Sequence, residues 1–173
     1  MSLLASSEYA RQKTVKLATT DWFNNRLRAN SNQFVFVTLT AKQCLLNVDG
    51  NLVRTTREDM DREVGKFLTR LDTAVYGNAV KRYGKRLHRI DASHGGADSY
   101  QRLHRHLIIE LPDRFLGGVG FQQFQDLVQT SWARSPYARE IIEVLPVHNL
   151  EAATRYLVKG GGADNLSLAN IVL

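Results

Sequence analysis

The sequence has few residues that would cross-link the chain or place it in a membrane. Its 173 residues include one cysteine, Cys44, which excludes disulfides within the chain and thiolate-rich zinc sites. No apolar run approaches the roughly 18 residues that span a bilayer, and the start, MSLLASSEYARQK, has no secretory core. We therefore expect a soluble, intracellular protein with no membrane partner, in which any metal ion is held by His, Asp, Glu or Gln.

Repeats, low-complexity tracts and proline-rich linkers are absent as well, and only three prolines occur. A chain of this length suits one domain with a real hydrophobic core and leaves little room for a second. We predict a single domain over residues 1–173.

Acidic residues are the minority, with 17 Asp and Glu against 23 Lys and Arg, a net charge of +6 and a pI near 9.7. This balance favours a polyanionic partner. The densest basic segment is KRYGKRLHR at 81–89, and its candidate DNA-binding residues are Lys81, Arg82, Tyr83, Lys85, Arg86 and Arg89. Cations around an aromatic ring suit phosphate contacts and base stacking. A solvated basic loop between a helix and a strand is an equally weighted alternative.

Apolar periodicity and turn residues predict the order of the secondary-structure elements. We expect a helix at 7–28 anchored by Trp22 and Phe23, and a helix at 56–79 with capping residues Thr55 and Glu58. The other expected elements are strands at 33–41, 86–93, 101–110 and 139–147, a turn at Asp49-Gly50, and helices at 121–132 and 150–159. After the first helix the order is β-α-β-β-α-β-α, which predicts a ferredoxin-like α+β sandwich with an antiparallel sheet.

The segment RLHRHLIIE at 102–110 places two histidines two residues apart on a predicted strand. Alternation puts His104 and His106 on one face and Arg105 on the other. If the preceding turn centres on 96–98, residues 88–92 lie opposite and bring Asp91 close to the pair. Two imidazoles and a carboxylate suit Mn²⁺ or Mg²⁺. His94, in the turn, is the alternative third ligand.

The last predicted helix carries Tyr156 and Lys159, which project from nearly the same side because they are three residues apart. Tyrosine attacks phosphorus only with help from a metal ion or a nearby cation such as Lys159. The commoner role of such a tyrosine is packing on the sheet.

Three segments in order carry a resemblance to a known family: FVTLT at 36–40, HRHLII at 104–109 and YLVKG at 156–160. They resemble motifs one, two and three of the HUH endonucleases, specifically the single-tyrosine initiators of rolling-circle replication, over residues 33–160. The resemblance implies that His104, His106 and Asp91 bind the metal ion, that Tyr156 is the nucleophile and that Lys159 assists it. Thr38 and Thr40 match the first motif, whose part is structural and DNA-contacting.

By this resemblance the protein nicks single-stranded or hairpin origin DNA, keeps a 5′-phosphotyrosine bond and leaves a free 3′-hydroxyl. It would act in the cytoplasm of a bacterial host of a plasmid or phage. The sequence contains no nucleotide-binding loop, so we expect no helicase domain here; either a host helicase is a partner or this is an excised nuclease domain.

The sequence departs from the family at Arg105, where a hydrophobic residue is usual, and this leaves the packing beneath that strand open. Relaxases place their tyrosine before the histidines, and two-tyrosine initiators carry a second tyrosine nearby, so both subfamilies are disfavoured. A single-tyrosine transposase and a non-catalytic nucleic-acid-binding module of the same fold remain as alternatives.

Overall fold

The computed structural model describes residues 33–95, 102–159, 166–167 and 170–172, together with isolated positions between 14 and 25. The expected helix over 7–28, with Trp22 and Phe23, lies largely outside the described residues, and the expected turn centre at 96–98 lies wholly outside them. None of the helices in the described part of the chain is long and apolar enough to cross a membrane.

The described chain follows the expected order of strands and helices, with three short additions. The elements are β1 (Phe34–Ala41), β2 (Cys44–Leu46), β3 (Leu52–Arg54), α2 (Arg57–Tyr76), α3 (Ala79–Tyr83), β4 (Arg89–His94), β5 (His104–Glu110), η1 (Asp113–Phe115), α4 (Gly117–Ala133), β6 (Ala138–Pro146) and α5 (Leu150–Leu157). The β2–β3 hairpin is the addition that matters most below, because the sequence predicted only its turn.

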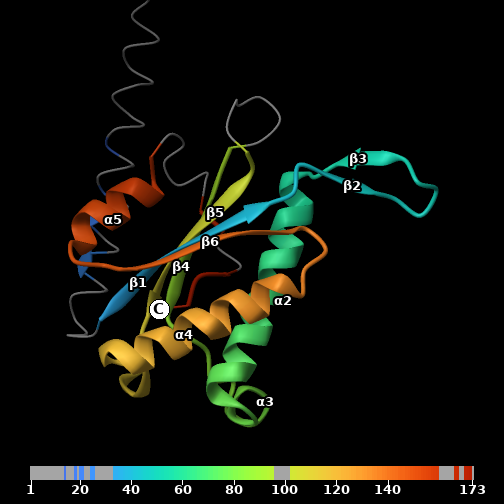
Figure 1. Ribbon diagram of the computed structural model, residues 1–173. Coiled ribbons are helices and arrows are strands. Elements are labelled where there is room, and N and C mark those ends of the chain that lie inside the picture. The colour runs from blue at the N-terminus through green and yellow to red at the C-terminus, as the bar shows by residue number, and fades with distance from the viewer. Residues whose placement is uncertain are drawn as a thin grey trace, which may run out of the picture.

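Four strands form one antiparallel sheet in the order β4-β5-β1-β6 (Figure 1). The first strand of the chain therefore lies between the third and the fourth of these strands, and each helical crossover skips a neighbour. This is the split arrangement of a ferredoxin-like sandwich. The predicted α+β fold class is confirmed.

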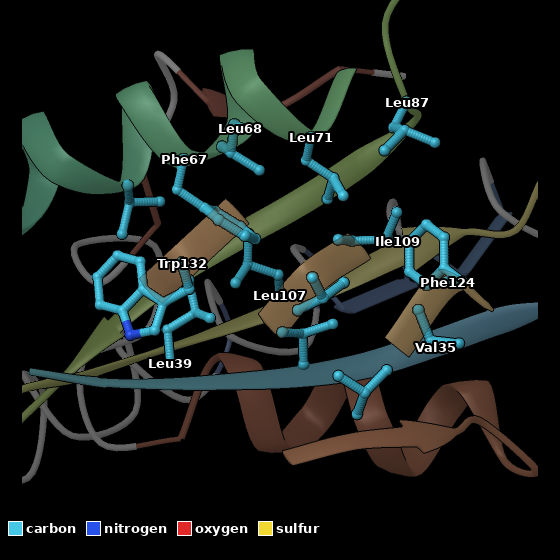
Figure 2. Close-up of a cluster of buried hydrophobic side chains, with 14 of the residues drawn as sticks. Val35, Leu39, Phe67, Leu68, Leu71, Leu87, Leu107, Ile109, Phe124 and Trp132 are labelled. Atoms are coloured by element: carbon cyan, nitrogen blue, oxygen red, sulfur yellow. The ribbon is translucent and has the colours of Figure 1, made fainter. Parts of the chain in front are cut away.

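Helices α2 and α4 cover one face of the sheet and enclose the main core (Figure 2). Phe67 and Leu71 of α2, Trp132 of α4 and Leu39 of β1 are all fully buried there. The rings of Phe67 and Trp132 meet edge to face at 5.8 Å. Burying one such side chain contributes about 1.5–3 kcal/mol, so this face supplies much of the driving force for folding.

The N-terminus of α2 is capped one residue later than the sequence pattern suggested. The Thr56 hydroxyl accepts a bond from the Asp59 amide at 3.1 Å, and the Asp59 carboxylate accepts one from the Thr56 amide at 3.1 Å. Thr55 instead donates its hydroxyl to the Lys42 carbonyl at 2.6 Å. Both threonines have an acidic residue three positions on, so spacing alone did not choose between them.

The opposite face of the sheet is covered by α5 over a smaller apolar cluster that includes Phe34, Ile108 and Leu157. Near the C-terminus, Leu166 and Val172 form antiparallel bridges with Ala92 and Arg89, so this segment pairs with the outer edge of β4. At the end of the sheet where β4 finishes and β5 begins, the apolar cluster gives way to polar rings.

Candidate active site

Three imidazoles gather on the α5 face, at the end of the sheet where β4 finishes and β5 begins. His94 lies opposite His104 in the ladder, and His106 lies opposite Ala92. The ring centres of His104 and His106 are 4.7 Å apart, and the His94 ring lies 5.6 Å and 5.0 Å from them. The expectation that His104 and His106 share a face is confirmed, and His94 joins them.

Each histidine of β5 uses its Nδ1 for a hydrogen bond. The His104 Nδ1–H donates to the Arg102 carbonyl at 2.7 Å, and the His106 Nδ1 is hydrogen-bonded with the Thr38 hydroxyl at 3.1 Å. The His106 Nε2 is buried and has no partner. Histidines that bind metals are held in this way, with one ring nitrogen fixed by a protein oxygen and the other left for the ion.

Burial lowers the pKa of His106 to about 3, and the neighbouring rings of His104 and His94 add to the effect. Burial is also the leading cause that lowers the pKa of His94 and of His104. All three rings are therefore neutral at neutral pH, and the neutral imidazole is the form that coordinates metal ions.

Tyr156 lies beside this cluster on α5. This residue is 47% exposed. The centre of its ring lies 5.0 Å from that of His106 and 5.8 Å from that of Phe36, both in edge contacts. The Lys159 Nζ lies 5.8 Å from the centre of the tyrosine ring. Tyr156 and Lys159 also line a hollow of about 440 Å³, so the tyrosine faces both the histidines and open space.

A hydrogen bond links α5, the helix that carries Tyr156, to the histidine cluster. The His94 Nε2 is hydrogen-bonded with the Leu157 carbonyl at 2.9 Å, and the Leu157 side chain is buried in the cluster under α5. A shift of α5 would therefore break a bond to one of the three imidazoles.

Asp91, the predicted third ligand, lies on the other face of the sheet, and this prediction is wrong. It stands opposite Leu107 in the ladder, and its buried carboxylate binds the Arg105 guanidinium through two bonds of 2.9 Å and 2.6 Å. Because side chains alternate along a strand, Asp91 lies on the face of β4 opposite to that of Ala92 and His94. The hairpin register also differs from the expected one, which put residues 88–92 opposite the two histidines, because His94 pairs with His104 and Ala92 with His106.

Arg105, the departure from the family pattern, is explained by the same ion pair. Its guanidinium is almost completely buried, and it also donates to Asp61 at 2.5 Å. The Asn170 side-chain amide also donates to the Asp91 Oδ2, the oxygen that accepts from the Arg105 Nη2, at 2.8 Å. A charge that would be costly in this core is therefore matched by two carboxylates.

The predicted basic segment lies at the other end of the sheet. It ends at Arg89, the first residue of β4, whereas His94 is the last residue of that strand. The two ends of β4 are roughly 17 Å apart at about 3.3 Å per residue. Arg89 is buried and donates to Asp72 at 2.7 Å, and Arg86 donates to the Val80 carbonyl at 3.2 Å. The prediction that Arg89 contacts a phosphate is wrong, because this residue is only 6% exposed and pairs with Asp72. Arg86 is partly exposed and also pairs with the buried Asp72 carboxylate, at 3.5 Å.

The rest of that segment is open to solvent. Lys81 and Arg82 are exposed on α3, Tyr83 is 81% exposed, and the Lys85 Nζ lies 4.6 Å above the Tyr76 ring. The basic surface is therefore smaller than predicted, and it does not adjoin Tyr156. Thr38 and Thr40, in contrast, lie directly opposite His106 and His104, so the first motif borders the site as expected.

Within the described residues, no group of three or more His, Cys, Asp or Glu side chains is arranged to hold a metal ion. The Nε2 of His94 is taken by the Leu157 carbonyl, so the third imidazole does not converge with the other two. The ring nitrogens of His104 and His106 are still of a type that binds metal ions, and the buried Nε2 of His106 has no other partner.

No protein-family model matches the chain, and neither a curated protein nor a solved structure matches it.

Proposed function

We propose that this protein is a metal-dependent, site-specific nickase and strand transferase of single-stranded DNA. The observation that carries the proposal is the tyrosine ring 5.0 Å from His106, whose buried Nε2 has no partner. A half-exposed phenol beside neutral imidazoles brings a nucleophile next to metal-binding nitrogens. The order of the three motifs, which resembles that of the HUH endonucleases, supports the same reaction.

In this proposal Tyr156 attacks the scissile phosphorus. Its phenolic oxygen gives up a proton and forms the new bond to phosphorus, while the bond from phosphorus to the 3′-oxygen breaks. The 3′-oxygen takes a proton and leaves as a free 3′-hydroxyl, and the 5′-phosphate stays on the tyrosine. The Lys159 ammonium, close to the ring, is placed to stabilise negative charge on the phenolic oxygen or the phosphate.

His104 and His106 would hold the metal ion. His94 stands beside them in place of Asp91, but its Nε2 is hydrogen-bonded with the Leu157 carbonyl, so the two histidines of β5 are the proposed ligands. A bound ion polarises the scissile phosphate. The Thr38 hydroxyl and the Arg102 carbonyl hold the two rings in place. Because the candidate ligands are imidazoles without a carboxylate, we propose Mn²⁺ or another transition-metal ion over Mg²⁺, which prefers oxygen ligands.

The biological setting that we propose is the start of rolling-circle replication on a plasmid or phage in the cytoplasm of a bacterial host, with a host helicase as partner. A single-tyrosine transposase would carry out the same chemistry on other DNA ends. The sequence of the joined DNA would distinguish the two.

The deciding experiment incubates the protein with a library of single-stranded oligonucleotides and Mn²⁺ and looks for a covalent protein–DNA band, whose junctions are then sequenced. We expect Tyr156→Phe to lose the band and the free 3′-hydroxyl together while DNA affinity is kept, because only the phenolic oxygen is removed. Tyr83→Phe is the matched control, since that tyrosine is exposed at the far end of the sheet, and it should form the band like the wild type.

Three outcomes would contradict parts of the proposal. A covalent band in Tyr156→Phe would move the nucleophile to another residue. Nicking without any attached protein would indicate attack by water. A wild type that binds DNA but never nicks it, with any sequence or metal ion, would favour the non-catalytic binding module.

A further inference from the structure

The β2–β3 hairpin stands out from the four-stranded sheet (Figure 1). Several of its aliphatic side chains are exposed. Leu46 and Leu52 face each other across the two strands and are 69% and 74% exposed, and Val48 at the turn is fully exposed. Val53 is about half exposed. Such a group of apolar side chains on a projecting element is typical of an interaction site.

Hydrogen bonds and a glycine hold the turn of this hairpin in a defined conformation. The Asn47 side-chain oxygen accepts bonds from the amides of Asp49 and Asn51 at 3.0 Å and 2.8 Å, and Gly50 takes the positive φ of 79° that the turn requires. The Gly50 amide donates to the Asn47 carbonyl at 3.0 Å. The aliphatic side chains are therefore presented on a defined scaffold.

The base of the hairpin adjoins the histidine end of the sheet. β2 begins three residues after β1 ends, and Thr40 near that end pairs with His104. Arg57, which begins α2 directly after the hairpin, is close enough for its charge to act on His94, whose pKa is lowered by burial first and by His104 and Arg57 in addition. The base of the hairpin therefore lies at the same end of the sheet as the histidines.

Charge around the hairpin favours an anionic ligand. Residues 42–57 contain the exposed cations Lys42, Arg54 and Arg57, and Asp49 at the turn is the one acidic residue among them. A protein partner or a second copy of the chain is less well suited, because four aliphatic side chains are far fewer than the roughly 20–30 residues that each partner contributes to a stable interface. The ligand that fits both features carries phosphates, which would lie near the base of the hairpin, and an apolar surface, which would lie near its tip. A nucleic acid has both.

We propose that the β2–β3 hairpin binds DNA at a junction between duplex and single strand next to the cleavage site, with Leu46 and Leu52 packed on the terminal base pair. An end base pair presents a flat apolar surface, and aliphatic side chains are known to pack against bases in this way. The three cations would hold the flanking phosphates. The inference rests on the proposed function for the position of the DNA, and it names the substrate as a stem with a single-stranded segment.

The test measures binding rather than cleavage, by fluorescence anisotropy in a Tyr156→Phe background. The two probes are an unstructured oligonucleotide and a stem-loop that carries the same single-stranded segment. We expect tighter binding of the stem-loop, and we expect L46S/L52S to weaken stem-loop binding about tenfold while binding of the unstructured probe stays unchanged. V119S is the matched control, because Val119 is an exposed aliphatic residue on α4, and it should affect neither probe.

Val48→Ser is a second variant that keeps the test decisive if the double variant folds poorly, since the Val48 side chain is fully exposed. It should weaken stem-loop binding in the same direction. Equal losses on both probes, no loss on either, or a background protein without preference for the stem-loop would each overturn the inference. So would a wild type that is dimeric and becomes monomeric in L46S/L52S, as measured by sedimentation, because the hairpin would then be a protein interface.

Failure of the inference and failure of the proposed function are distinguishable. If the junction preference is absent while wild-type protein still forms the covalent band on unstructured DNA, only the inference fails. If the band never forms but the junction preference and its loss in L46S/L52S are seen, the hairpin binds DNA without the proposed chemistry.

Discussion

Each face of β5 carries a buried polar side chain, Arg105 on one and His106 on the other, and the two differ in whether their nitrogens have partners. On the face covered by α2 and α4, the Arg105 guanidinium is buried against the carboxylates of Asp91 and Asp61. On the α5 face, the His106 ring is also buried, yet its Nε2 has no partner and a half-exposed tyrosine lies beside it. Buried charges that are paired stabilise the fold, whereas a buried imidazole nitrogen without a partner, beside a half-exposed tyrosine, is suited to a ligand.

The largest expected effect is on the paired face. Replacing Asp91 with Ala leaves the Arg105 charge buried without its bidentate partner, which should lower the free energy of unfolding by about 3–5 kcal/mol. Urea denaturation followed by circular dichroism measures the change. The double variant D91L/R105L removes both charges and should recover most of the loss, because apolar pairs of similar size replace buried ion pairs at little cost.

A further variant, Asp91→Asn, tests whether Asp91 is a metal ligand, the assignment that the structure contradicts. If Asp91 were a metal ligand after all, Asp91→Asn would keep the size of the side chain and chiefly lower affinity for Mn²⁺. We expect the reverse, a loss of stability that is the same with and without the ion.

A smaller effect is expected from metal binding on the α5 face. Mn²⁺ at 100 times its dissociation constant should raise the free energy of unfolding by about 2.7 kcal/mol if it binds only the folded chain. Thermal denaturation with and without the ion measures the shift, and EDTA should reverse it. An equal shift in His106→Leu would show that the ion binds elsewhere.

The smallest effect is expected from His106→Leu without metal. The substitution loses the bond to Thr38 but also removes a buried nitrogen that has no partner, and these two terms oppose each other. We expect the free energy of unfolding to change by no more than about 1 kcal/mol, measured by urea denaturation. A loss as large as that of Asp91→Ala would mean that the two faces are both structural and that the contrast drawn between them is wrong.

Local patterns were sufficient for most of the fold. The strand over 33–41, the long helix after Thr56 and the hairpin around HGGADS were all predicted within a few residues, because periodicity and turn residues act over short ranges. The β2–β3 hairpin was missed beyond its Asp49-Gly50 turn. Its strands are three residues long and their aliphatic side chains are exposed, so neither length nor alternation marked them.

Only part of the candidate site could be predicted from the sequence. Alternation along β5 was enough to put His104 and His106 on one face. Tyr156 and Lys159 do lie close together as predicted, but α5 ends at Leu157 and Lys159 lies in the turn that follows, not on the predicted helix over 150–159. The basic segment was overestimated for a different reason. Local composition does not reveal that Arg89 turns inward to Asp72, a residue 17 positions earlier on α2.

The sequence by itself determined which side chains share a face of each strand, since the backbone repeats every two residues whatever it packs against. Only the tertiary structure decided which residues of β4 meet the histidines. That choice depends on the register between two strands, and a shift of one residue exchanges the faces. Here the register brings His94 beside His104 and leaves Asp91 to neutralise Arg105 in the core, so that a residue expected to hold a metal ion instead stabilises the fold.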